Sequence, residues 1–239
     1  MDESVKYFNE MHMGEFSNSK EFLFFLPIGI SEGHGKHLPV GTDTYQAEYV
    51  VERVAEKIGT ISVIGPTLNY GHCRATSDLP GTLSISFDSL RNIVYDILKG
   101  VCKNDFEKII VISGHAGTTH MTALRLAAEK IIDEYDVKIM LLSDYELAYE
   151  LKGEKVSEND GHGGEIETAR MMHIKGQLVD EDRPSTEVQY PRFLIIKNYN
   201  DYLTEGVRGN AEIANEEDGR EINDYVINGI IKNINEYFF

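Results

Sequence analysis

Short apolar runs and amphipathic segments alternate along the chain. The apolar runs are typical of strands buried on both faces, and they occupy residues 22–28, 61–64, 108–112, 137–142 and 193–196. Apolar residues recur at helical spacing in the segments that follow, which cover residues 45–58, 88–101 with Asp88 as a cap, 119–135, 165–174 and 216–238. The alternation predicts a mainly parallel sheet covered by helices on both faces, which binds ligands at the carboxyl ends of its strands.

Length and composition indicate a single domain. The chain has 239 residues, 41% of them hydrophobic, which suffices for one large core, and no linker interrupts it. The longest polar stretch, residues 153–164, carries one of the clusters described below, so we interpret it as a site loop. We therefore expect one domain that spans residues 1–239.

The charge of the chain excludes some classes of binding partner. Forty acidic side chains oppose 23 basic ones, for a formal net charge of −17. Nucleic acids and anionic membranes need a cationic protein face, so we expect neither as a partner. The first residues do not resemble a signal peptide, and no apolar stretch approaches the roughly 18 residues of a membrane span. Because Cys73 and Cys102 are too few for a disulfide framework, we expect two free thiols and a cytoplasmic location.

Three clusters combine glycine, histidine and acidic residues. Their candidate side chains are Glu32, His34 and Asp43 in residues 27–44, His115 in residues 113–117, and His162, Glu165 and Glu167 in residues 161–168. Two of the clusters follow predicted strands, and the chain holds only eight histidines, so we expect the clusters to converge. Carboxylates and imidazoles suit Zn, Mn and Fe alike. The alternative for the first cluster is a glycine-rich surface loop with solvated polar residues.

These residue types fit a hydrolase site with two divalent metal ions. Such a site holds its ions about 3.5 to 4 Å apart and needs an anionic bridging ligand, further carboxylates and neutral imidazoles. Glu32 and His34 alternate along the chain and, in an extended segment, would each reach a different ion. Asp43, just ahead of a predicted helix, could bridge both ions. His115 would complete one ion and Glu165 the other.

Other chemistries have less support. Cys73 adjoins His72, but adjacent residues rarely orient as nucleophile and base, and no third group is evident. The serine of residues 113–115 lacks the G-x-S-x-G elbow. No P-loop or G-x-G-x-x-G motif follows a predicted strand. Metal-assisted hydrolysis is therefore the favoured interpretation.

Four segments resemble the motifs of the creatininase (creatinine amidohydrolase) family. They are residues 26–43, 70–82, 114–118 and 162–168, and they occur in the family's order. The resemblance implies a three-layer α/β/α sandwich, assembled into homohexamers. It further implies a site with two metal ions that hydrolyses a carbon–nitrogen bond in a small amide, formamide or cyclic amide.

The resemblance also implies roles for individual residues. The implied metal ligands are Glu32, His34, Asp43 as the bridge, His115 and a further carboxylate that we assign to Glu165. We expect His162 to protonate the leaving nitrogen and Glu167 to support the site or handle protons, and the pocket to be lined by Tyr70, His72 and Arg74. The alternatives are a turn histidine for His162 and a surface ion pair for Arg74. We expect structural roles for His37, His120 and His173.

The sequence departs from the pattern of creatininase at three points. Thr76 replaces the histidine of the second motif, and Gly117 stands where creatininase has a carboxylate ligand. The chain has no tryptophan, whereas creatininase closes over creatinine with tryptophans. We therefore expect a substrate other than creatinine. Two alternative functions follow: a non-catalytic, metal-stabilised oligomeric binding protein, and a peptidase-like member of the family.

Overall fold

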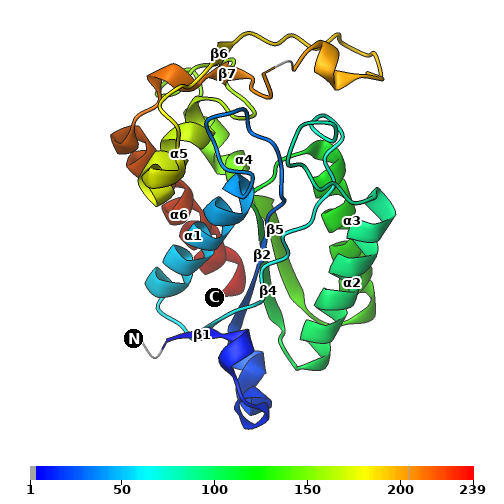
Figure 1. Cartoon of the computed structure of the whole chain (residues 1–239). Coiled ribbons are helices and arrows are strands. Elements are labelled where there is room, and N and C mark those ends of the chain that lie inside the picture. The colour runs from blue at the N-terminus through cyan, green and yellow to red at the C-terminus, as the bar shows by residue number, and fades with distance from the viewer. Residues whose placement is uncertain (1–3, 204) are drawn as a thin grey trace.

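A computed structural model describes residues 4–203 and 205–239. At its centre lies a five-stranded sheet in the order β1-β3-β2-β4-β5, in which every pair of neighbouring strands is parallel (Figure 1). The strands are β1 (Val5–Tyr7), β2 (Leu23–Ile28), β3 (Ser62–Ile64), β4 (Lys108–Ser113) and β5 (Lys138–Ser143). The mainly parallel sheet predicted from the apolar runs is thus confirmed, and β1 is an edge strand that the pattern did not predict.

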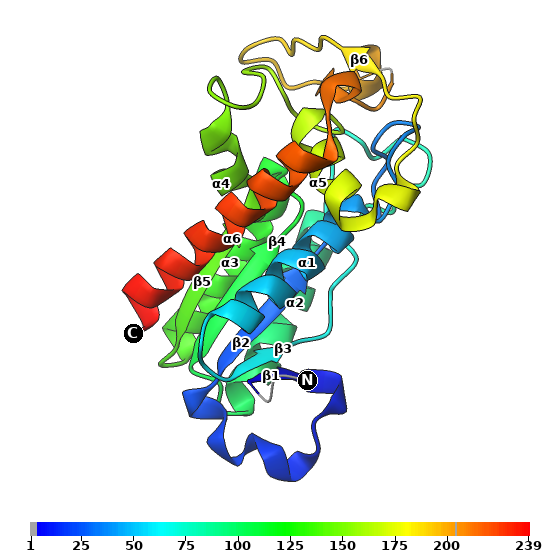
Figure 2. The ribbon, with the colours of Figure 1, turned by 90° about the vertical axis from the view of Figure 1, so that its left-hand side faces the viewer.

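Helices cover both faces of this sheet, which makes a three-layer α/β/α sandwich (Figures 1 and 2). One face carries α1 (Thr42–Lys57), α4 (Asp144–Ala148), α5 (Glu165–Lys175) and α6 (Glu216–Phe238). The other face carries α2 (Phe87–Lys103) and α3 (Thr118–Glu134). This architecture confirms the fold class expected from the sequence.

The central strand β2 shows why its sequence is apolar throughout. Leu23 and Phe25 pack into the core formed with α1 and α6, whereas Phe24 and Leu26 pack into the core formed with α2 and α3. All four side chains are buried. Since successive side chains of a strand point to opposite faces, a strand with a helical layer on each side needs apolar residues at every position.

Shorter elements complete the chain. Two of them, β6 (Ser185–Thr186) and β7 (Gly209–Asn210), pair antiparallel above the carboxyl ends of the large sheet (Figure 1). Short 3₁₀ segments lie at Phe8–Glu10, Met13–Glu21, Tyr149–Leu151, Gly176–Leu178, Tyr199–Asp201 and Ala211–Ile213. No helix among the described residues has the length and apolar character needed to cross a membrane.

Three local predictions were wrong. Residues 193–196 form a loop and not a strand, because the backbone at Phe193 turns into the left-handed region with φ of 65° and its side chain is 95% exposed. The N-cap of α2 is Ser86 and not Asp88, since the Ser86 hydroxyl accepts the backbone N–H of Ser89. Helix α1 begins at Thr42, so Asp43 lies inside its first turn and not ahead of it.

Candidate metal centre

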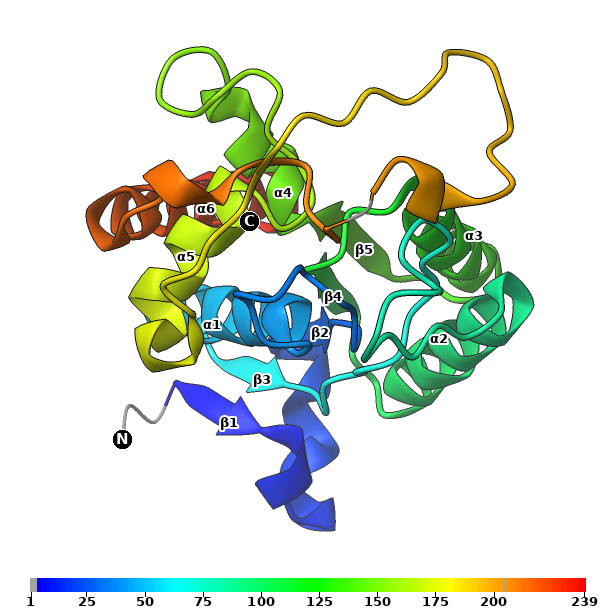
Figure 3. The same cartoon turned by 45° about the horizontal axis from the view of Figure 1, so that its top comes forward.

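The candidate site lies where the chain leaves β2 and β4 in opposite directions. From β2 the chain passes through α1 to β3, which lies on one side of β2. From β4 it passes through α3 to β5, which lies on the opposite side of β2, beyond β4. A parallel sheet opens a crevice at such a point, beyond the carboxyl ends of the two strands. Figure 3 looks toward this end of the sheet, where the loops that follow β2 and β4 lie close together.

Backbone contacts bring the two loops together. Ile28 and Ser113, the last residues of β2 and β4, are partners in the ladder, and the N–H of Gly114 donates to the carbonyl of Ile28 at 2.9 Å. A Cβ atom at position 114 would lie only 2.0 Å from the carbonyl oxygen of Asp43. Glycine at this position therefore lets the first turn of α1 approach the end of β4. His115 consequently lies beside Asp43.

Glu32, Asp43 and His115 form one group of potential ligands. The Nδ1 atom of His115 lies 2.8 Å from Oε2 of Glu32 and 3.3 Å from Oδ2 of Asp43. Three different segments supply these side chains: the loop after β2, the first turn of α1 and the loop after β4. Two carboxylates and one imidazole around a common point are a ligand set for a divalent transition metal.

A second group consists of His34, Asp43 and Glu167. The Nε2 atom of His34 lies 3.0 Å from Oδ1 of Asp43 and 3.4 Å from Oε2 of Glu167. Asp43 belongs to both groups and presents one carboxylate oxygen to each. This is the arrangement that a bridging carboxylate between two neighbouring ions requires.

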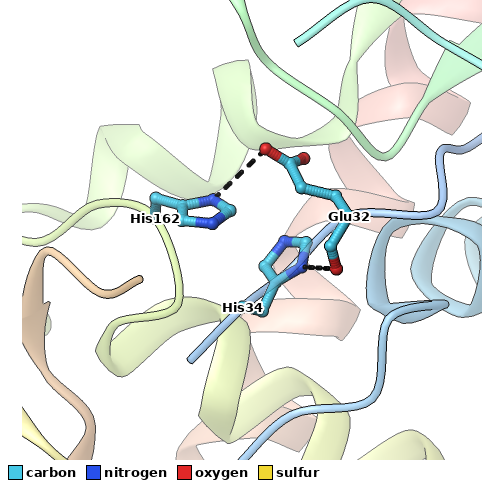
Figure 4. Close-up of side chains that lie close together, drawn as sticks. All are labelled: Glu32, His34 and His162. Carbon is cyan, nitrogen blue, oxygen red and sulfur yellow. Dashed lines mark hydrogen bonds and ion pairs between the residues drawn. The ribbon is translucent and has the colours of Figure 1, made fainter. Parts of the chain in front are cut away.

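A third, overlapping group contains His162 with Glu32 and His34 (Figure 4). The rings of His34 and His162 lie 4.2 Å apart between centroids, and Nδ1 of His162 lies 4.0 Å from Oε1 of Glu32. The opposite nitrogen, Nε2 of His162, donates to the carbonyl of Gly33 at 2.8 Å. Because a carbonyl only accepts, this bond holds a proton on Nε2 and leaves Nδ1 of the neutral ring free to accept one.

The ring orientation of His34 is set in the same way. Its Nδ1 donates to the carbonyl of Glu32 at 3.0 Å, a bond drawn in Figure 4, so Nε2 carries the lone pair of the neutral ring. This lone pair faces Asp43 and Glu167. Two acceptors at such a distance repel each other unless a cation lies between them or the ring is protonated. A second contact that holds the ring nitrogen of a ligand in place is typical of metal-binding histidines.

The electrostatics of the apoprotein agree with a site built for cations. Burial disfavours the charged ring of His34, but Asp43 and Glu167 outweigh burial and raise its pKa from 6.5 to about 10. Burial likewise opposes a charged His115, yet Glu32 and Asp43 hold its pKa well above 6.5. Burial would raise the pKa of Glu32, but His115 and His162 lower it well below 4.5. Positive charge is thus strongly stabilised between these carboxylates.

The buried polar atoms test whether these residues fit a metal. Glu32, His34 and Asp43 are each only 1% exposed. The atoms Oε2 of Glu32, Nε2 of His34 and Oδ2 of Asp43 have no hydrogen-bond partner among the described residues. A buried acceptor without a partner costs about 1–3 kcal/mol, and divalent cations held by the two groups would satisfy these atoms. The donor set therefore fits bound metal ions.

The structure brings together six of the seven clustered candidates, and Glu165 is the exception. Its Oε2 accepts the backbone N–H of Ser157 at 3.0 Å. Glu167 and not Glu165 lies beside His34, and it also accepts the N–H of Gly163 at 2.5 Å. An α-helix turns by about 100° per residue, so two side chains two positions apart point away from each other and only one can enter the site.

Gly117 accommodates the ring of His115. A Cβ atom at this position would lie 2.5 Å from Nε2 of His115. Real Cβ atoms do not approach another heavy atom so closely, so a side chain here would displace the ring. In this arrangement the loop after β4 supplies one imidazole and no carboxylate, and the additional carboxylate comes from α5.

The segment with the three predicted pocket residues lies beside the potential metal ligands. Its anchor is Thr76, a residue that the sequence analysis did not assign to the site: its buried hydroxyl donates to Oε1 of Glu32. His72 is half-buried and donates through Nδ1 to the carbonyl of Ile85 at 2.8 Å. Arg74 donates to the carbonyl of Ile196 at 3.1 Å, a backbone contact rather than the surface ion pair considered as the alternative. Tyr70 is 50% exposed.

A buried polar network behind the ligands joins α1 to α5. Gln46 donates to the carbonyl of Glu167 at 3.2 Å and accepts the hydroxyl of Tyr145 at 2.6 Å. One turn further along α5, Arg170 is fully buried and forms an ion pair of 2.5 Å with Asp144. These contacts hold the helix that carries Asp43 against the helix that carries Glu167. The sequence offered no signal for them, because Gln46, the pair Asp144 and Tyr145, and Arg170 lie far apart along the chain.

Comparisons with known proteins show which family the chain resembles. Residues 9–234 match the family model for creatininase, described as creatinine amidohydrolase. The chain is 26% identical over 237 residues to creatinine amidohydrolase of Pseudomonas putida, with 90% of each chain covered. It is 28% identical over 170 residues to the mycofactocin precursor peptide peptidase of Mycolicibacterium smegmatis, covering 66% of this chain and 61% of that one. A solved structure described as "Creatininase Mn" superposes with a TM-score of 0.87 at 23% identity, over 98% of this chain and 99% of that one.

Proposed function

The chain belongs to the creatininase family, and on this premise we propose that it is a metal-dependent hydrolase that cleaves a carbon–nitrogen bond in a small amide, formamide or cyclic amide. The observation that carries the proposal is the position of Asp43, whose Oδ1 faces His34 at 3.0 Å and whose Oδ2 faces His115 at 3.3 Å. One carboxylate with an imidazole at each oxygen supports a site for two ions.

The proposed ligands divide into two sets that share Asp43. Glu32, Asp43 and His115 would hold one ion, and His34, Asp43 and Glu167 the other, so Glu167 replaces Glu165 in the ligand assignment. Ions bound here would polarise an amide carbonyl and lower the pKa of a water molecule into the physiological range. Zn, Mn and Fe all suit this donor set.

The chain's own residues would then handle the proton. Nδ1 of His162 points toward Glu32, at 4.0 Å, and Nε2 is held by the carbonyl of Gly33. The ring can therefore take up a proton at Nδ1, the nitrogen that faces Glu32. Delivery of that proton to the departing nitrogen completes cleavage, because an amine leaves far more readily than its anion. We propose this general-acid role for His162.

The pocket side supports a substrate other than creatinine. Thr76 stands where the family motif has a histidine, so no imidazole is available to a substrate at this position. The Thr76 hydroxyl donates to Glu32 instead. The chain also has no tryptophan to close over a flat ring. His72 keeps Nε2 free to accept a hydrogen bond, since Nδ1 donates to Ile85. We propose that His72, Arg74 and Tyr70 contact the substrate.

A peptidase is the second candidate function. The 28% identity to the mycofactocin precursor peptide peptidase favours it, because the same metal chemistry can cleave a peptide bond. Homohexameric assembly and a cytoplasmic location stay predictions. Light scattering on the purified protein tests the assembly.

Hydrolysis assays on reconstituted protein test the proposal. Apoprotein loaded with Zn, Mn or Fe(II) would be assayed against formamides, lactams, cyclic ureas and short peptides. The proposal expects metal-dependent turnover of at least one small amide, loss of that turnover in Glu32→Gln, and retention in Glu165→Gln, whose side chain lies outside the ligand groups. Turnover of peptides alone would favour the peptidase. Metal binding without turnover of any compound would favour a non-catalytic binding protein.

A further inference from the structure

His120 lies directly behind the proposed ligand His115. It is buried in the first turn of α3, and the two rings meet edge to face with their centroids 4.9 Å apart. Both of its ring nitrogens are used. The backbone N–H of His72 donates to Nδ1 of His120 at 3.2 Å, and Nε2 lies 3.2 Å from Oγ of Ser113. Since Nδ1 accepts, the proton of the neutral ring is on Nε2, which donates to Ser113.

Ser113 passes this contact on to His115. Its Oγ donates to the carbonyl of His115 at 2.8 Å and accepts the N–H of His115 at 3.2 Å. With the bond from His120 as well, the hydroxyl has one donated and two accepted hydrogen bonds, which is its full capacity. The hydroxyl therefore has one preferred orientation, and it clamps the backbone of His115 on both sides.

The other arm of His120 holds the pocket segment. The N–H of His72 points at Nδ1, and a Cβ atom at Gly71 would lie 2.7 Å from the same nitrogen, so this segment lies against the ring. The segment is tied to the ligands a second time, where Thr76 donates to Glu32. One buried ring thus connects the backbone of a proposed ligand with the backbone of a proposed substrate residue.

We propose that His120 is a positioning residue that places His115 for metal binding through Ser113 and, independently, holds His72 on the substrate side. Its two nitrogens divide the two tasks: Nε2 serves the metal and Nδ1 serves the pocket. The first task rests on the proposed function, because it requires that His115 binds a metal. The second task does not.

Two conservative variants separate the tasks. An amide oxygen in His120→Asn can replace Nδ1 as the acceptor for His72, but the shorter side chain does not reach Ser113. An amide nitrogen in His120→Gln can replace Nε2 as the donor to Ser113. We would measure the affinity of each apoprotein for Zn²⁺ by competition with a chromophoric chelator, and the hydrogen exchange of residues 70–76 by mass spectrometry.

The expected results differ in opposite directions. His120→Asn should lose about 10- to 100-fold in Zn²⁺ affinity, as is usual when a residue supporting a ligand is removed, and keep slow exchange in residues 70–76. His120→Gln should keep its Zn²⁺ affinity and exchange roughly 5-fold faster in that segment, the effect of one lost hydrogen bond. His120→Phe keeps the ring and should show both changes.

Controls keep the outcome decisive. His173→Gln removes a histidine that contacts Tyr49 at 3.1 Å, outside the ligand groups, and should match the wild type in both measurements. If the wild type itself binds no Zn²⁺, the proposed function fails. If the wild type binds Zn²⁺ and His120→Phe binds it equally with unchanged exchange, the positioning role is wrong. Equal changes in Asn and Gln variants would also overturn it, because they would show that the ring only fills space.

Discussion

Glu165 and Glu167 both lie in the first turn of α5, but their side chains point in different directions. Oε2 of Glu165 accepts the N–H of Ser157 at 3.0 Å, whereas Oε2 of Glu167 lies 3.4 Å from Nε2 of His34. Both carboxylates lie in the first turn of the helix, where the helix dipole stabilises a negative charge. Only Glu167 belongs to one of the groups of potential metal ligands. This pair therefore offers a matched test of the ligand assignment.

We predict that Glu167→Gln removes one of the two ions and Glu165→Gln does not. Gln preserves the size of the side chain but lacks the charge that a divalent cation needs. The loss of affinity at one site should exceed the roughly 10- to 100-fold that is typical when a supporting residue is changed. Metal content after dialysis, by elemental analysis, checks this. Retention of both ions in Glu167→Gln, with a loss in Glu165→Gln, would return the assignment to Glu165.

Gly117→Ala should weaken the metal site while the fold persists. The new methyl group would lie 2.5 Å from Nε2 of His115 and must displace the ring from its position beside Glu32 and Asp43. Gly100→Ala is the control, because position 100 lies inside α2 with nothing within 4 Å, and there alanine should stabilise the helix by up to about 1 kcal/mol. Zn²⁺ titration and urea unfolding of both variants measure the effects. Equal Zn²⁺ affinity in the two would mean that His115 is not a ligand in this orientation.

Without metal, the protein should become less stable as the pH rises from 6.5 toward 10. The pKa of His34 is raised to about 10 in the folded state, so its favourable contribution is complete below pH 6.5 and disappears as the pH approaches 10. His115 shifts in the same direction. Urea unfolding in the presence of a chelator at pH 6.5, 8 and 9.5 measures the decline. His34→Gln should flatten it, and an equally steep decline in that variant would assign it to other groups.

Metal binding should release protons at neutral pH. His34 and His115 both have raised pKa values in the apoprotein and must lose a proton to bind a metal ion. The heat of Zn²⁺ binding should therefore depend on the ionisation enthalpy of the buffer. Calorimetry in phosphate and in Tris at the same pH gives the number of protons released. Identical heats in the two buffers would mean that these rings are not the ligands.

The buried ion pair of Arg170 and Asp144, behind the candidate site, should be important for the stability of the fold. Arg170 and Asp144 are both fully buried, and removing one partner leaves an uncompensated charge. Arg170→Leu should cost about 3–5 kcal/mol in the free energy of unfolding. The exposed pair of Arg220 with Glu217 provides the comparison, since water screens such a pair and Arg220→Leu should change the free energy of unfolding far less. Chemical denaturation of the two variants checks this difference, and similar losses would contradict the account.

The sequence was most informative where chemistry and strand ends coincide. Glu32 and His115 follow β2 and β4 directly, and neighbouring parallel strands necessarily deliver their loops to the same place. Four of the five predicted ligands, together with His162, therefore lie together in the structure. The continuous apolar runs also located β2 to β5, because a strand between two helical layers has no polar face.

What the sequence did not reveal depends on tertiary structure. Which of Glu165 and Glu167 enters the site depends on the rotation of α5 about its axis, and neither residue's identity encodes that rotation. The apolar residues 193–196 read as a strand, but whether such a run is buried depends on which element packs over it, and here Phe193 is exposed. Thr76 reaches Glu32 from 44 positions away in the chain, a contact that no local pattern marks.

Titration of the apoprotein with Zn²⁺ or Mn²⁺, with amide hydrolysis followed at each addition, tests the central claim most directly. The two oxygens of Asp43 face two different histidines, so we predict that activity reaches its maximum at about two ions per chain, and that Asp43→Asn abolishes both binding steps. Full activity at one ion per chain, or an Asp43→Asn variant that still binds two, would contradict the dinuclear site.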